Sequence, residues 1–133
     1  MLRLHSEKEK IKVVSDQIGS PTSALDLAKV CWRIIKLKKD KKLPFILHWS
    51  DAGIASWFDI AVAVGEIAKE LDINKTEAIV IPINSSEYPT SAQRPKYSLL
   101  NTRITSEVLG MQAIHWRKNL RNILIEYKKH NKI

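Results

Sequence analysis

The stretch KVVSDQIGSPTSALDLAKV, residues 12–30, contains a strand, a polar turn and the start of a helix in direct succession. The β-branched run at residues 11–14 predicts a short strand, which ends at the polar segment 15–22 with its glycine and proline. A helix follows, because Ser23 and Asp26 stand at the spacing of a capping box. Helical spacing predicts that this helix buries one apolar face, made of Ala24, Leu27, Ala28, Cys31, Ile34 and Ile35.

The alternation of strand and helix continues along the chain. LPFILHWS, residues 43–50, is a continuous apolar run, and such runs are typical of strands buried on both faces of a parallel sheet. The next helix begins near Ser56, again with an acidic residue three positions on, Asp59. A third strand is expected at residues 78–85. The stripe of the second helix comprises Trp57, Ile60, Ala61, Val64, Ile67, Ala68 and Leu71.

Two more helices are expected after a long polar loop. Asn101 can cap the first and Gly110 ends it, while the second carries Trp116, Leu120, Ile123, Leu124 and Tyr127 on one side. The whole order predicts the α/β class. Three strands make a thin sheet, and the apolar strand at residues 46–49 needs a neighbour on each side. Residues 1–133 are therefore expected to form a single region at the end of a larger α/β protein.

Composition limits the classes of function. A chain of 133 residues with 44% hydrophobic residues suits one soluble domain, with no run of ~20 apolar residues and no secretory signal, so we expect a cytoplasmic protein without membrane contact. The single cysteine, Cys31, excludes an internal disulfide and is expected in the core. The net charge of +8 lies largely in two lysine-rich runs after predicted helices. We interpret these runs as solvated surface and expect no nucleic-acid partner.

The sequence contains no self-contained active site. It has no glycine-rich dinucleotide loop, no phosphate-binding loop and no tyrosine followed four residues later by lysine. The histidines are scattered without metal-ligand spacing, and His48 is expected as a core or sheet-edge residue. We therefore predict no catalytic residue and no metal site in this chain.

Two polar loops are the candidate ligand-binding segments. Asp16 and Gln17 follow a strand, where open α/β sheets place ligand contacts, although both side chains could instead cap turns. In EYPTSAQRPKYS, residues 87–98, Tyr88 and Arg94 lie in a segment that its two prolines make stiff. The Arg94 guanidinium could bind a carboxylate or phosphate, or it could serve as a strut to a carboxylate of the domain.

These same segments resemble a known family. VVSDQIGSPTSALDLAKV (13–30), LHWSDAGIASWFDIAVAVGEI (47–67) and PINSSEYPTSAQRPKYSLLNT (82–102) are similar, in order, to the C-terminal part of the dTDP-4-dehydrorhamnose reductases. That family belongs to the extended short-chain dehydrogenase/reductases, and the similarity runs over nearly the whole chain. Where the family usually has an aspartate cap, this chain has Asn101.

The resemblance implies a C-terminal substrate-binding lobe together with the last elements of a Rossmann-type domain. The complete enzyme would use NADPH or NADH to reduce a dTDP-4-keto-6-deoxy-sugar in dTDP-L-rhamnose biosynthesis. It also implies that Asp16, Gln17, Tyr88 and Arg94 contact the nucleotide sugar, with residues 85–98 forming a stiff wall of the cleft. On this mapping, residues 46–49 are the last strand of the Rossmann sheet.

The resemblance also implies what this chain lacks. The family's glycine-rich loop and Tyr-xxx-Lys pair lie upstream of Met1, so we expect a C-terminal fragment, a truncated reading frame or one product of a split gene, without the N-terminal Rossmann core. Such a chain would bind no cofactor, be inactive alone, and either pair with a separate N-terminal Rossmann chain or self-associate. The alternative is a non-catalytic regulatory module similar to the beta subunit of methionine adenosyltransferase.

Overall fold

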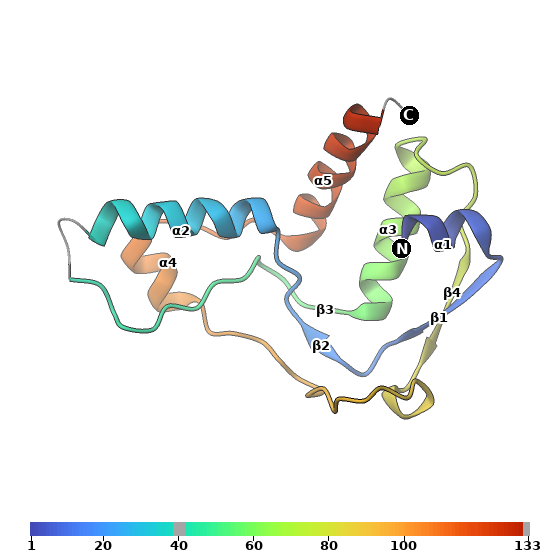
Figure 1. Cartoon of the computed structure of the whole chain (residues 1–133), viewed down its shortest axis with the longest axis horizontal. Helices are drawn as coiled ribbons and strands as arrows, with labels where there is room; N and C mark the ends of the chain where they lie inside the picture. Colours follow the sequence, from blue (N-terminus) through green and yellow to red (C-terminus); the bar gives the residue numbers. More distant parts are fainter. Residues whose placement is uncertain (39–41, 132–133) are drawn as a thin grey trace.

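The computed structural model describes residues 1–38 and 42–131 and confirms the predicted α/β class (Figure 1). Part of each lysine-rich run lies outside these residues. Among the described helices, none combines the length and apolar character that a membrane crossing requires. In chain order, the helices and strands are α1 (Leu2–Glu7), β1 (Lys10–Val14), β2 (Ile18–Gly19), α2 (Ala24–Lys38), β3 (Ala55–Ser56), α3 (Trp57–Glu70), β4 (Ile79–Ile83), the 3-10 turn η1 (Ser85–Glu87), α4 (Arg103–Leu109) and α5 (Trp116–Asn131).

The main sheet pairs the first and third predicted strands directly. β1 and β4 run parallel, with Lys10 opposite Ile79 and Val14 opposite Ile83. Both strands are confirmed within a few residues of their predicted bounds. A second, short ladder joins β2 and β3 antiparallel. Since β1 and β4 point the same way, their polar C-terminal loops emerge side by side, and this is the feature that positions the candidate site.

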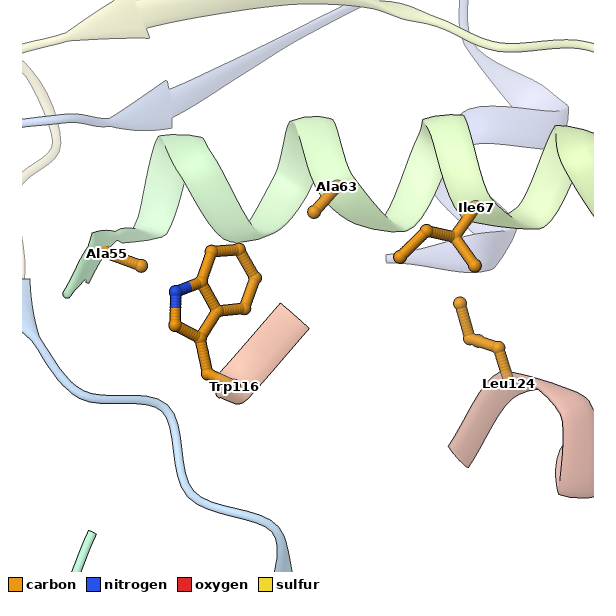
Figure 2. Packing of buried hydrophobic residues seen from close by; sticks show 5 residues of the cluster. All are labelled: Ala55, Ala63, Ile67, Trp116 and Leu124. Carbon is orange, nitrogen blue, oxygen red and sulfur yellow. The ribbon is translucent and has the colours of Figure 1, made fainter. Parts of the chain in front are cut away.

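The best-packed helix is α3. Ser56 caps it through the predicted capping box: the Asp59 amide donates to Ser56 Oγ at 3.1 Å, and the Ser56 amide donates to the Asp59 carboxylate at 2.7 Å. The helix packs against β1, β4, α1 and α5. Figure 2 shows its contact with α5, where apolar side chains from both helices and from β3 form the core cluster of Ala55, Ala63, Ile67, Trp116 and Leu124.

A buried histidine holds α1 in place, a feature that the sequence did not reveal. The ring of His5 is fully buried; its Nε2 lies 2.9 Å from the carbonyl oxygen of Ala61, and the Ala78 amide donates to its Nδ1 at 3.3 Å. The ring packs so tightly on α3 that a Cβ at Gly65 would come within 2.6 Å of it. The glycine inside α3 is therefore needed for close packing of α1.

A polar cluster joins α2 to α5. The side-chain amide of Asn119 donates to the carboxylates of Asp26 and of the buried Asp51, both at 2.7 Å. The backbone N–H of Ser23 donates to the same Asp51 oxygen at 3.0 Å. On its other side, α2 packs against α4. The predicted end of α4 is confirmed, with Gly110 in the left-handed conformation at φ 62°. Asn101 accepts from the amide of the first helical residue, although Thr102 occupies the formal cap position.

The predicted strand at residues 43–50 is wrong for this structure. The segment has no regular secondary structure, and Phe45 and Ile46 are exposed. A strand needs a neighbour to satisfy its backbone hydrogen bonds. Within residues 1–38 and 42–131, no strand lies beside this segment. The apolar run is thus present without the pairing that would make it a strand.

The predicted burial of α2 is also wrong. Its periodicity is helical as expected, but the helix buries only Val30, and most of the predicted face, including Cys31, is exposed. Cys31 was expected in the core, and His48 in the core or at a sheet edge. Neither position is observed, since both side chains are exposed. Trp57, assigned to the core stripe of α3, is 49% exposed. Helical spacing identifies an apolar face, whereas burial depends on what lies opposite.

Candidate functional site

The candidate site lies where the parallel strands end. Asp16 and Gln17 follow β1, while Asn84 and the η1 turn follow β4. The two loops are tied together at their start, because the Ser15 amide continues the ladder by donating to the Ile83 carbonyl at 2.9 Å. Ligands commonly bind outside the carboxyl ends of strands in α/β proteins.

Asp16 fixes the geometry between the two loops. Its carboxylate accepts from the Ser85 amide at 2.8 Å and from the Ser85 hydroxyl at 2.9 Å, and Lys96 lies 3.7 Å away. Burial raises the pKa of this carboxyl, but the hydrogen bonds from Ser85 and the charge of Lys96 outweigh burial, so the pKa lies below its ordinary value. The capping role considered for Asp16 is therefore present, and its two oxygens are occupied within the protein.

The loop carrying Arg94 is pinned at both ends. Its start is held by η1, where Glu87 accepts from the Asn84 amide at 2.8 Å. Its end forms a bridge to β2, with the Ile18 amide donating to the Lys96 carbonyl at 2.8 Å and the Ser98 amide to the Ile18 carbonyl at 2.9 Å. The bridge comes close enough that a Cβ at Gly19 would meet Ser98 Oγ at 3.0 Å. Residues 88–95 are therefore anchored between two fixed points.

Three hollows adjoin one another around Gln17 and Arg94. The first, of about 530 Å³, lies between the two strand-end loops and is lined by all four residues proposed from the sequence, Asp16, Gln17, Tyr88 and Arg94. The second, of about 580 Å³, lies beside β2, and the third, of about 510 Å³, lies beside α1 and β1. Gln17 and Arg94 line all three, so they stand at the junction.

The walls of these hollows differ in chemistry. The first is mainly polar, with asparagine, serine and glutamine side chains beside Arg94 and Lys96. The other two share an apolar wall formed by Trp57 and Ile60 at the start of α3. Sequence reasoning placed both of these residues in the core. The signal that could have revealed them is their position on the first turn of a helix that starts next to the strand-end loops.

Arg94 is an exposed guanidinium at the junction of the hollows. Among the described residues it forms no salt bridge, so the predicted strut to a carboxylate is not observed. Tyr88 is also exposed, at the edge of the first hollow. Arg94, Tyr88 and Trp57 together line the third hollow, beside α1 and β1. Such a set can bind a phosphate and stack on a flat ring.

The four glycines, the residue type that a dinucleotide-binding loop uses, lie far apart in the fold. Of the four glycines, Gly65 lies inside α3, Gly110 ends α4, Gly19 pairs in β2, and Gly53 has φ 91° in a loop packed on His115. None opens a tight turn onto the N-terminus of a helix, as a pyrophosphate requires. Over residues 1–38 and 42–131, no group of three or more histidine, cysteine or acidic side chains is placed to hold a metal ion.

Comparison with known proteins places nearly the whole chain in one family. The family described as RmlD substrate binding domain matches residues 1–129. The spore coat polysaccharide biosynthesis protein SpsK of Bacillus subtilis is 38% identical over 126 residues, covering 95% of this chain and 40% of its own length. A dTDP-4-dehydrorhamnose reductase of Aggregatibacter actinomycetemcomitans is 33% identical over 125 residues, covering 92% of this chain and 42% of its own.

Solved structures agree with the sequence relatives. A dTDP-4-dehydrorhamnose reductase ortholog from Clostridium acetobutylicum superposes with a TM-score of 0.79 at 30% identity, over 99% of this chain and 42% of its own. The Bacillus anthracis reductase, solved in complex with NADP, gives a TM-score of 0.77 at 32% identity, over 94% of this chain and 40% of its own. The chain thus spans about two fifths of the length of the relatives it matches, and it belongs to the RmlD substrate binding domain family.

Proposed function

We propose that this chain is the nucleotide-sugar-binding part of an NAD(P)H-dependent reductase of a dTDP-4-keto-6-deoxy-sugar, as in dTDP-L-rhamnose biosynthesis. One observation carries the proposal: Gln17 and Arg94 both line three adjoining hollows, in a chain whose relatives include dTDP-4-dehydrorhamnose reductases. A nucleotide sugar has three chemically different parts, and the three hollows have walls of different chemistry.

Each side chain is assigned a part of the ligand by its chemistry. Arg94 binds the diphosphate, because its planar fork matches phosphate oxygens and none of the ion pairs among the described residues involves it. Trp57 and Tyr88 offer exposed rings on which the base can stack. The Gln17 amide can donate to and accept from a sugar hydroxyl. Asp16 acts indirectly, since its bonds to Ser85 hold the two loops together.

Reduction requires groups that the described residues do not supply. NAD(P)H provides the hydride in such enzymes, and the glycines of this chain do not fit a dinucleotide. A tyrosine can donate the proton when a nearby lysine lowers its pKa. No tyrosine in this chain is followed four residues later by a lysine. We therefore propose that the isolated chain binds the sugar nucleotide, binds no NADPH, and does not catalyse reduction.

Titration calorimetry of the 133-residue chain with dTDP and with dTDP-glucose tests this proposal. Both should bind saturably, and Arg94→Ala should weaken binding at least ~10-fold, while Arg94→Lys, which keeps the charge and loses the fork, should fall between. Arg103→Ala is the matched control, because Arg103 pairs with Glu107 on the surface of α4. Equal affinity in wild type and Arg94→Ala, or no binding by a folded chain, contradicts the proposal. Saturable micromolar NADPH binding would overturn its second half.

A further inference from the structure

His5 in α1 is a fully buried ionisable side chain that the proposed function does not use. Both ring nitrogens face backbone groups: Nε2 lies 2.9 Å from the carbonyl oxygen of Ala61, and the Ala78 amide donates to Nδ1 at 3.3 Å. A carbonyl only accepts and an amide N–H only donates, so Nε2 carries the proton and Nδ1 does not. The two contacts therefore fix the ring as one neutral tautomer.

A second proton on this ring would have no partner. It would sit on Nδ1, where the Ala78 N–H already points at the ring, so two donors would face each other. The same proton would place a charge in a fully buried position, which is costly without a partner of opposite charge. Protonation of His5 and its present contacts are therefore incompatible.

The charged side chains around His5 do not supply that partner. Glu77 lies beside Gly65 at this contact, but Lys69 on α3 pairs with it at 3.8 Å. The acidic side chains of α3 are used at its cap or in ion pairs with α5. On α1, Arg3 and Glu7 pair with each other on the side away from His5, and the charged residues of segments 8–12 and 72–75 are exposed.

Polar contacts attach α1 to the rest of the fold, where it lies against α3 (Figure 1). Besides the His5 ring, two side chains of the loop before β4 hold the helix. Asn74 donates to the Leu2 carbonyl at 2.8 Å, and the Thr76 hydroxyl donates to the His5 carbonyl at 3.2 Å. Amide and hydroxyl side chains do not titrate near neutral pH, so pH acts on these contacts through His5.

α1 also forms part of a wall of the candidate site. Met1 and Leu4 line the third hollow together with Tyr88 and Arg94. We propose that His5 is a positioning residue for this hollow: its neutral ring holds α1 in place, and protonation releases the helix and removes that part of the wall. Resting on the proposed function, the consequence is an affinity for the nucleotide sugar that falls with pH. The released state binds the extra proton, so attachment weakens below about pH 6.5, where an imidazole takes up a proton.

Calorimetry of the 133-residue chain with dTDP-glucose tests this consequence, because the esterified diphosphate of this probe keeps its charge near neutral pH. Wild-type affinity should fall at least ~5-fold from about pH 7.5 to pH 5.5, and that of His5→Gln less than ~2-fold, because an amide can donate to Ala61 without titrating. His48→Gln makes the same change at an exposed histidine and should keep the wild-type profile. Equal profiles in wild type and His5→Gln overturn the proposal.

A measurement without ligand separates this inference from the proposed function. At about pH 7.5, two-bond proton–nitrogen spectra should show the His5 ring protonated at Nε2. As the pH falls, the backbone signals of α1 and of Ala78 should change before those of α5. The other tautomer, or unchanged α1 signals down to about pH 5.5, overturns the proposal even if dTDP-glucose binds. Release of α1 in a chain that binds no dTDP-glucose supports the role of His5 and contradicts the proposed ligand.

Gly65 provides a second test that does not depend on the folding of one variant. A Cβ at this position would lie 2.6 Å from the His5 ring, so Gly65→Ala should lower the melting temperature. In the His5→Ala background the same change should raise it, because alanine favours a helix interior over glycine once the ring is gone. The double variant should also lose the pH dependence of dTDP-glucose binding. A Gly65→Ala effect of the same sign in both backgrounds overturns the contact on which the proposal depends.

Discussion

α2 and α3 are two amphipathic helices of similar length that differ in how much of their apolar surface is buried. Each begins after a serine with an aspartate three residues on, and each carries apolar residues at helical spacing. α3 buries residues on several sides, among them Ala61, Ala63, Val64, Ile67 and Ala68, whereas α2 buries Val30 alone. In Figure 1, α3 lies among β1, β4, α1 and α5, while α2 extends away from them with α4 beneath it.

The difference shows what amphipathicity means in energetic terms. A helix with an apolar face gains its stability from whatever covers that face, at roughly 25 cal/mol for each Å² removed from water. α3 finds its cover within the described chain. α2 is held by the Asp26–Asn119–Asp51 cluster and by α4, and its widest apolar side faces solvent. The following predictions test this contrast, starting with the largest effect.

The first prediction compares the same substitution in the two helices. Ile67→Ala in α3 should lower the free energy of unfolding by about 3 kcal/mol, because it empties a 3% exposed core position. Ile35→Ala in α2 should change it by less than about 0.5 kcal/mol, since the side chain faces solvent. Urea unfolding of the isolated chain measures both. A loss at Ile35 as large as that at Ile67 would show that the Ile35 side chain is buried in the isolated chain.

The second prediction compares the caps. Ser56→Ala should cost about 1 kcal/mol, because Ser56 Oγ accepts from the Asp59 amide at 3.1 Å and donates to the Asp59 carboxylate at 2.7 Å. Ser23→Ala should cost roughly half of that, because the hydrogen bond that the Ser23 hydroxyl accepts from the Asp26 amide is 3.4 Å long. Thermal unfolding of the two variants at pH 7 measures the difference. A larger loss of stability in Ser23→Ala than in Ser56→Ala would mean that the cap contributes more to the stability of α2 than the cap of α3 does to α3.

The third prediction concerns acid. The hydrogen bond from Lys29 lowers the pKa of Asp26, burial opposes it, and Asn119 adds to the lowering. A carboxyl whose pKa is lower in the folded state stabilises the protein above its unfolded pKa, and this contribution is lost as pH falls below about 4. The attachment of α2 should therefore weaken between about pH 4 and pH 2. In the Asp26→Asn variant, the melting temperature should change less with pH over that range than in the wild type.

Glu70 provides the comparison on α3. The hydrogen bond from Arg121 lowers its pKa as well, but this pair lies on the surface. The acid sensitivity due to Glu70 should disappear in about 1 M salt, whereas that due to Asp26, which is mostly buried, should persist. Glu70→Gln and Asp26→Asn measured at low and high salt separate the two. Equal salt sensitivity of both would argue against a protected Asp26 in α2.

The candidate site shows how far sequence reasoning reaches. Asp16, Gln17, Tyr88 and Arg94 were chosen as polar residues after strands or in a stiff loop, and the structure gathers all four around one hollow. Their role as ligand contacts stays a prediction. Strand order made the gathering foreseeable, because parallel strands bring their ends together. Trp57 and Ile60 were not foreseeable from spacing, which marks an apolar face without saying whether protein or a cavity lies opposite.

Sequence alone determined the local elements of this protein. The β-branched runs became β1 and β4, the Ser56–Asp59 capping box started α3, and Gly110 ended α4, because dihedral preference and capping act over a few residues. Tertiary structure decided the rest. It left residues 43–50 without a strand, exposed Cys31, buried His5 between α1 and α3, and brought Arg94 to the junction of the hollows. Burial and strand pairing depend on partners distant in sequence, which no local pattern specifies.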